Sequence, residues 1–131
     1  MKHSIFIVED NRTEGLIMKL AFSGIENVET HYFASGKELL DNLSKAPDVL
    51  VLDMILPDIQ GIELLGIVRQ KSPKTRIVIV SAEEKHGLIA EAQKEGIFNY
   101  VVKNESCLRY LKQVMEDLLL IIRSQTKVKV H

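Results

Sequence analysis

Short runs of β-branched and other apolar residues alternate with amphipathic segments along the whole chain. The apolar runs predict strands at 5–8, 49–52, 77–80 and 98–102, and alternating apolar and polar residues predict a less buried strand at 28–33. The segments after them predict helices at 13–23, from 35 through 43, and at 61–71, 84–95 and 106 to about 124. Strands that alternate with helices form βαβ units, which build a parallel sheet covered by helices on both faces. The alternation therefore predicts an α/β fold.

Length and composition indicate one soluble domain. Of the 131 residues, 46% are hydrophobic and 27% are charged, and the formal net charge is -1. This balance is typical of globular proteins and gives no reason to expect a nucleic acid or an anionic membrane as partner. We expect a domain at 1–125 followed by a short tail at 126–131.

The chain has features of a protein from a reducing cytoplasm. Cys107 is the single cysteine, so no intrachain disulfide can form. The first apolar segment is short and ends in Glu9 and Asp10, unlike the apolar region of a signal peptide. The longest apolar run, 118–122, is far too short to span a bilayer. We therefore expect a cytoplasmic location.

Two of the predicted helices have apolar faces worth defining. In the first, the apolar residues at helical spacing are Leu16, Ile17, Leu20 and Ala21, with Asn11 or Thr13 as N-cap and Gly24 at the exit. In the last, a continuous stripe should pack on the sheet: Leu108, Leu111, Met115, Leu118, Leu119 and Ile122. Leu120 and Ile121 lie outside this stripe, which predicts either a deeply packed helix end or a surface for a partner.

Polar residues follow four of the five predicted strands. The first strand ends at Glu9 and Asp10, the third at Asp53, the fourth at Ser81 and the fifth at Lys103. In a parallel α/β sheet, ligands bind beyond the carboxyl ends of the strands. We therefore expect three carboxylates, a hydroxyl and an ammonium group to meet at one edge.

This combination favours phosphoryl chemistry with a divalent metal. Crowded carboxylates repel one another unless a cation neutralises them, and Mg²⁺ prefers such oxygen ligands. A lysine and a hydroxyl opposite the metal would complete a cradle for a transferred group. Asp53 is the natural acceptor, because it ends the apolar central strand and stands between both sets of helpers.

These motifs resemble those of response-regulator receiver domains over nearly the whole chain. The acceptor loop has Asp53, then Pro57 and then Gly61, followed by Ile62-Glu63-Leu64-Leu65. The acidic pair, the Ser81-Ala82 step and Tyr100-Val101-Val102-Lys103 match the other motifs of the family in order. The resemblance implies a flavodoxin-like (βα)5 doubly wound sandwich with strand order 2-1-3-4-5.

The resemblance also implies roles for individual residues at the acceptor. Glu9 and Asp10 would form the metal-binding pair, with Asp10 the direct ligand. Asp53 would supply a metal bond and the nucleophilic carboxylate, and the backbone carbonyl of Ile55 a further ligand for Mg²⁺ or Mn²⁺. Lys103 would pair with Asp53 at rest and with a phosphoryl oxygen afterwards.

A conformational switch is the second implication. Ser81 would move toward the phosphoryl group and donate a hydrogen bond, and Tyr100 would turn inward into the vacated space. The donor would be a histidine kinase or a histidine phosphotransfer protein. The output would be a downstream protein or a fused domain, with phosphorylation-dependent dimerisation through the fourth helix, fifth strand and fifth helix. The domain would catalyse its own phosphorylation and dephosphorylation without being a turnover enzyme.

Two departures from the family pattern lead to further expectations. Asn104 stands where the family usually has a proline after a cis peptide, and a non-proline cis bond costs about 3 kcal/mol, so we expect a trans link. The resemblance implies that Ile55 and Glu83 tune the access of water to the phosphoryl group. An apolar Ile55 predicts slow self-dephosphorylation.

Two alternative functions remain open from the sequence. One is a pseudo-receiver, which would use the fold for binding without phosphorylation, and Asn104 keeps that alternative open. The other is a hydrolase of the haloacid-dehalogenase kind. Such enzymes need a second aspartate two residues after the first, where this chain has Ile55.

Overall fold

The computed structural model describes the backbone of residues 2–130 and the side chains of residues 2–125. Within that part of the chain, strands and α-helices alternate in the predicted order, with one short 3-10 helix. The elements are β1 (His3–Val8), α1 (Arg12–Ser23), β2 (Val28–Phe33), α2 (Gly36–Asn42), η1 (Leu43–Lys45), β3 (Val49–Leu52), α3 (Gly61–Lys71), β4 (Arg76–Ser81), α4 (His86–Lys94), β5 (Asn99–Val102) and α5 (Cys107–Val130).

The strands form one parallel sheet in the order β2-β1-β3-β4-β5, as predicted. Strand β1 pairs with β2 on one side and with β3 on the other, so the winding of the chain reverses between β1 and β3. Ligand sites of open α/β sheets lie at such a reversal, beyond the carboxyl ends of the strands. The topology thus places the ends of β1 and β3 at the centre of the expected site.

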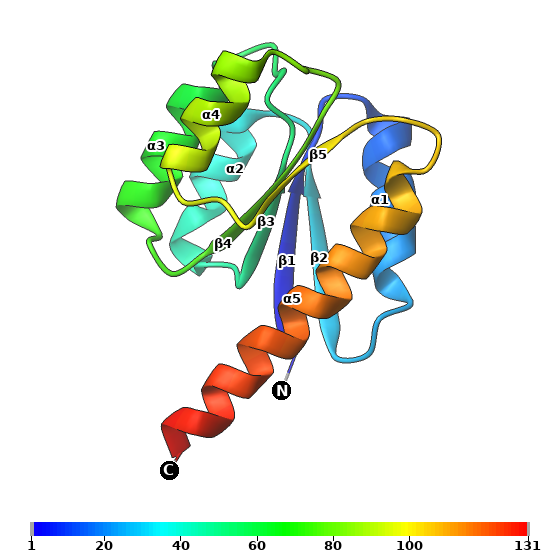
Figure 1. Cartoon of the computed structure of the whole chain (residues 1–131), viewed down its shortest axis with the longest axis vertical. Coiled ribbons are helices and arrows are strands. Elements are labelled where there is room, and N and C mark those ends of the chain that lie inside the picture. The colour runs from blue at the N-terminus through cyan, green and yellow to red at the C-terminus, as the bar shows by residue number, and fades with distance from the viewer. Residues whose placement is uncertain (1, 131) are drawn as a thin grey trace.

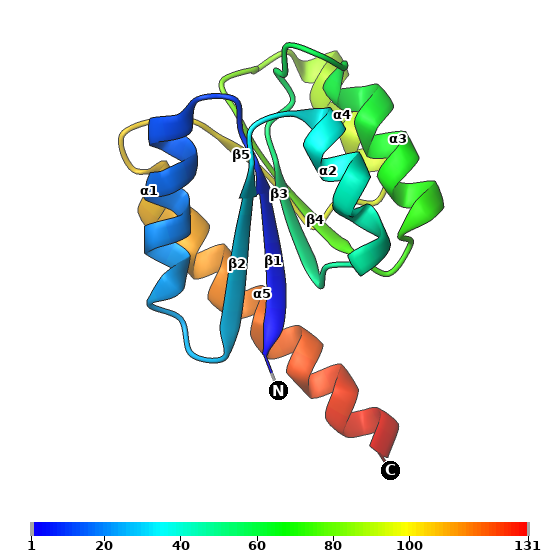
Figure 2. The same cartoon turned by 180° about the vertical axis from the view of Figure 1, so that it is seen from behind.

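Helices cover both faces of the sheet. Figures 1 and 2 show α1 and α5 against one face and α2, α3 and α4 against the other. Successive strand residues point to opposite faces, so Ile5 and Ile7 pack in the core beneath α1 and α5, whereas Phe6 and Val8 pack beneath the other three helices. Because the central strand β3 is buried on both faces, it needs the continuous apolar sequence that predicted it.

The predicted apolar face of α1 is wrong. The helix buries Gly15, Met18 and Phe22 against the sheet, and Ala21 is half-buried beside them. The exposed fractions of Leu16, Ile17 and Leu20 are 52%, 44% and 73%. Phe22 is the largest apolar side chain of this helix and is fully buried in the core. Because its burial sets the rotation of the helix, the smaller leucines remain on the outer face.

Other boundaries and caps agree with the sequence more closely. Asn11 is the N-cap of α1, its side chain accepting from the N–H of Glu14 at 3.0 Å, and Gly24 is the C-cap. Helix α4 begins at His86 instead of residue 84. Gly96 follows α4 with a φ of 81°, a left-handed conformation that glycine adopts without strain.

Helix α5 extends to Val130, beyond the end predicted near residue 124, and Figure 1 shows its last turns projecting past the sheet. Its inner face is the predicted stripe together with Val114. Leu120 and Ile121 lie outside that stripe, with 63% and 40% of their surface exposed. The side chains of the proposed tail, 126–131, lie outside the described residues. None of the helices described is both long and apolar enough to cross a membrane.

Candidate functional site

The ends of β1 and β3 hold two buried carboxylates side by side. Glu9 and Asp53 are only 1% and 4% exposed, whereas the neighbouring Asp10 is exposed. Main-chain bonds continue the sheet to these residues: the N–H of Asp53 donates to the carbonyl of Val8 at 3.1 Å, and that of Glu9 to Phe33 at 3.1 Å. The rigid sheet therefore fixes both acidic residues.

Carboxylate oxygens of Glu9, Asp10 and Asp53 lie within 4.8 Å of one another. Burial raises the pKa of Glu9 to about 8, against the hydrogen bond from Lys103, and the nearby charge of Asp53 adds to the rise. Three carboxylates in this space repel one another, and a hard divalent cation with oxygen ligands relieves the repulsion. The donor set fits Mg²⁺ or Mn²⁺.

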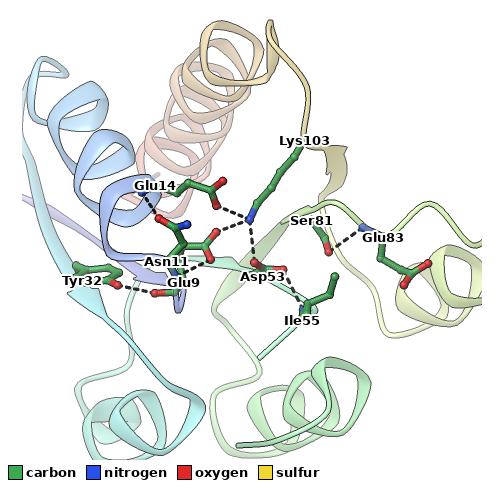
Figure 3. Close-up of polar contacts among 9 residues, drawn as sticks. All are labelled: Glu9, Asn11, Glu14, Tyr32, Asp53, Ile55, Ser81, Glu83 and Lys103. Carbon is green, nitrogen blue, oxygen red and sulfur yellow. Dashed lines mark hydrogen bonds and ion pairs between the residues drawn. The ribbon is translucent and has the colours of Figure 1, made fainter. Parts of the chain in front are cut away.

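Lys103 directly follows the edge strand β5, and its side chain reaches two of these carboxylates, Glu9 and Asp53. Its backbone N–H donates to the carbonyl of Ser81 at 2.9 Å. Its Nζ donates to Glu9 Oε1 at 2.6 Å, to Asp53 Oδ2 at 3.0 Å and to Glu14 Oε2 at 2.7 Å (Figure 3). Burial acts to lower the pKa of Lys103, but the hydrogen bonds to Glu14, Glu9 and Asp53 outweigh it and raise that pKa.

The contact with Glu14 was not predicted from the sequence. Glu14 lies in the first turn of α1, which Asn11 caps, and its side chain extends across the site to Lys103 (Figure 3). The helix starts immediately after the acidic pair, so any acidic residue of its first turn stands close to the carboxyl end of β1. That proximity is the signal that could have identified Glu14.

The second oxygen of Asp53 is held by the following loop. Asp53 Oδ1 accepts from the backbone N–H of Ile55 at 2.9 Å. The Ile55 side chain is 52% exposed and, as Figure 3 shows, lies beside the Asp53 carboxylate. An apolar side chain thus stands next to Asp53, and its predicted effect on the access of water stays a prediction.

Asp58 anchors this loop to α2, a contact that the sequence did not indicate. Its Oδ1 accepts from the N–H of Gly36 at 3.1 Å and its Oδ2 from the N–H of Lys37 at 2.8 Å. These bonds satisfy two donors at the start of α2, and the bond from Lys37 lowers the pKa of Asp58. The loop after β3 is therefore tied at both the acceptor and the neighbouring helix.

Ser81, Glu83 and Tyr100 form a second group on the β4 side of Asp53. Ser81 is fully buried at the end of β4, and its Oγ accepts from the N–H of Glu83 at 3.2 Å. The hydroxyl of Tyr100 donates to the backbone carbonyl of Glu83 at 2.8 Å, and its ring packs against the core. The Glu83 carboxylate accepts from the N–H of Lys85 at 3.1 Å. One loop therefore connects both predicted switch residues.

The link after Lys103 is trans, as expected, because the described residues contain no cis peptide bond. Asn104 also has a local role: its Oδ1 accepts from the N–H of Ser106 at 2.9 Å, and its carbonyl accepts from Cys107 at 3.2 Å. Asn104 thus forms the turn that leads into α5.

The sequence profile of the response regulator receiver domain matches residues 5–115. The chain is 31% identical over 99 residues to the DNA-binding transcriptional regulator NtrC of Klebsiella pneumoniae, covering 75% of this chain and 21% of NtrC. It is 28% identical over 131 residues to a protein-glutamate methylesterase/protein-glutamine glutaminase of Thermotoga maritima, covering 95% of this chain and 37% of that enzyme. The chain thus spans only a minor part of each of these relatives.

A solved structure shares the fold. The CheY-like response regulator receiver domain protein of Methanospirillum hungatei JF-1 superposes with a TM-score of 0.83 at 21% identity, over 95% of this chain and 99% of that one. The profile match covers most of the chain, and the strand order and the acidic edge agree with the motifs that carried the resemblance. The chain belongs to the response regulator receiver domain family of two-component systems.

Proposed function

We propose that this protein is a phosphoacceptor that receives a phosphoryl group on Asp53 from a histidine kinase or a histidine phosphotransfer protein. The observation that carries the proposal is the surrounding of Asp53: a carboxylate 4% exposed at the end of the central strand, next to two further acidic residues and 3.0 Å from the Lys103 ammonium. Buried charges of this kind are costly, and they cluster at functional sites.

The residues divide the work of transfer between them. An oxygen of Asp53 forms a bond to phosphorus while the bond from phosphorus to the donor breaks, and the donor leaves with that electron pair. Lys103 offsets charge on a phosphoryl oxygen. Glu9, Asp10, Asp53 and the carbonyl of Ile55 would hold Mg²⁺ or Mn²⁺. When bound, the metal supplies positive charge beside the transferred group.

The output is a changed protein-binding face. Ser81 Oγ accepts from the N–H of Glu83 at rest, and its hydroxyl hydrogen would be donated to a phosphoryl oxygen when the side chain moves toward it. Tyr100 responds because it is bonded to the same loop. The affected surface comprises α4, β5 and α5, where Phe98 and Tyr110 expose 41% and 52% of their area. A downstream protein, a fused output domain or a second copy would bind there. Beryllofluoride titration followed by a measurement of molecular size tests for the dimer.

In this role the protein catalyses gain and loss of its own phosphoryl group and is not a turnover enzyme. Its partners are proteins of the cytoplasm; neither nucleic acid nor membrane is a direct ligand. The overall charge supports the absence of nucleic acid and membrane ligands, because 17 basic residues are balanced by 18 acidic ones.

The test is incubation with Mg²⁺ and acetyl phosphate, followed by intact mass and peptide mapping. The expected product carries one phosphoryl group on Asp53 that base removes and acid does not, and EDTA prevents its formation. An unmodified protein under these conditions would identify a pseudo-receiver and end the proposal.

Ile55→Asn is expected to shorten the lifetime of the phosphoryl group. The isoleucine beside Asp53 offers no hydrogen bond to an attacking water, whereas an amide can hold one in place. We expect first-order loss of phosphate to be faster by about threefold or more. Decay is timed after removal of the donor, with Ile55→Leu as the apolar control at wild-type rate. Equal decay in Ile55→Asn and wild type would contradict the assigned role.

A further inference from the structure

Lys103 has every hydrogen-bond donor of its ammonium group in use. The Nζ atom donates to Glu9, Asp53 and Glu14 at 2.6, 3.0 and 2.7 Å. An ammonium group has three N–H donors and no acceptor. An incoming phosphoryl oxygen can therefore bind Lys103 only if one of the three carboxylates gives up its contact.

The three carboxylates differ in how firmly they are held. Glu9 is buried, and its other oxygen accepts from the N–H of Asn11 at 3.2 Å. Asp53 is buried too, and its other oxygen accepts from Ile55. The Glu14 side chain is 47% exposed, and among the described residues its carboxylate has a hydrogen bond to Lys103 alone. Water can replace Lys103 at an exposed carboxylate, and such ion pairs are weak.

We propose that Glu14 is a positioning residue that occupies the third donor of Lys103 at rest and vacates it for the phosphoryl group. This inference rests on the proposed phosphoacceptor function and names a control on the same site. With acetyl phosphate, a bond forms between an Asp53 oxygen and phosphorus, the phosphorus–oxygen bond to the acetyl group breaks, and acetate leaves with that electron pair. The Glu14 side chain rotates out toward the solvent, and the Lys103 N–H that it leaves binds a phosphoryl oxygen. No proton is transferred at Lys103.

Glu14 then acts as a competitor of the donor. Before transfer its carboxylate binds an N–H of Lys103 (Figure 3), which an oxygen of the donor would otherwise bind, and its negative charge repels the anionic donor. Both effects reduce the fraction of molecules ready to bind, which raises the donor concentration needed for a given rate. The Glu14–Lys103 contact would thus lower spontaneous phosphorylation by small metabolites.

The test compares Glu14→Gln with wild type and Glu105→Gln. Glutamine has the shape of glutamate without its charge, so its amide oxygen can accept from Lys103 only through a weaker, neutral hydrogen bond. Glu105 is an exposed residue in the turn that follows Lys103, and its replacement removes the same charge without touching the ammonium. With acetyl phosphate below saturation, we expect Glu14→Gln to be phosphorylated about threefold to tenfold faster than wild type at low salt. Glu105→Gln should stay within about twofold of wild type.

Three further measurements test the role of Glu14: the half-saturating donor concentration, the salt dependence and the thermal midpoint. The gain of Glu14→Gln should appear as a lower half-saturating donor concentration, and it should shrink at high salt, where exposed charges are screened. Thermal midpoints should be equal in all three proteins, since the contact is exposed. If wild type is phosphorylated and Glu14→Gln is no faster than Glu105→Gln, this inference is overturned while the proposed function stands. If wild type takes up no phosphate, the proposed function itself fails.

Discussion

Asp53→Asn is expected to abolish the phosphoryl adduct while the protein remains folded. An amide oxygen is a poor nucleophile for phosphorus, so the asparagine side chain should not form an acyl phosphate. Of the other two carboxylates of the cluster, Glu9 is held by Lys103 and by the N–H of Asn11, and Asp10 is exposed. The proposed metal site also loses one of its charged ligands, so we expect Mg²⁺ affinity to fall by about tenfold or more. Both changes are measured by intact mass after incubation with acetyl phosphate and by Mg²⁺ titration.

The fold should survive this substitution. Asn can still accept from the N–H of Ile55 through its amide oxygen, and Glu9 and Glu14 still neutralise Lys103. Removing one of two adjacent buried negative charges offsets the lost ion pair, so the free energy of unfolding should stay within about 1 kcal/mol of wild type.

Asp41→Asn is the matched control for Asp53→Asn. It makes the same chemical change at an exposed position of α2 and should be phosphorylated like wild type. Continued labelling of Asp53→Asn at the wild-type rate would show that another residue is the acceptor, and it would refute the assignment of Asp53.

The sequence predicted the sheet and the acidic edge for a simple physical reason. A parallel strand covered on both faces must be apolar throughout, so 49–52 could be recognised without its partners. Polar residues directly after such strands must lie at the carboxyl edge, because all the strands point the same way. Asp53 and Lys103 therefore meet although 50 residues separate them.

The errors arose where side-chain size and reach decide the outcome. Hydrophobic spacing in α1 allowed two faces, and the volume of Phe22 selected the one that also buries Met18. The close fit of Gly15 against Tyr32 reinforces this choice, since a Cβ on Gly15 would lie 2.2 Å from that ring. Asp58 was missed because its contact depends on the path of a loop, which residue spacing alone does not specify. Glu14 was missed because only residues at strand ends were considered, although the first turn of α1 lies beside the end of β1.

Gly61→Ala is expected to destabilise the protein by about 3 kcal/mol and to slow phosphorylation. A Cβ on Gly61 would lie 2.5 Å from the carbonyl oxygen and 2.6 Å from the Cα of Met54, closer than real Cβ contacts come. Met54 is buried and directly follows Asp53, so the overlap cannot be relieved by turning a flexible side chain. The loop must move, and it takes the acceptor carboxylate with it. Because small misplacements of reacting groups are costly, we expect the phosphorylation rate to fall by about tenfold or more.

Gly66→Ala is the control for Gly61→Ala, because it adds the same methyl group to the same helix, α3. Apart from its chain neighbours and the backbone of its own helix, no described atom lies within 4 Å of a Cβ at Gly66, so the methyl group meets open space. Alanine in a helix interior is favoured over glycine by about 0.5 to 1 kcal/mol, and Gly66→Ala should raise the free energy of unfolding by that amount. Urea unfolding of both variants measures the two opposite shifts. If Gly61→Ala unfolds at the wild-type urea concentration, the acceptor loop tolerates movement and does not hold Asp53 rigidly in place.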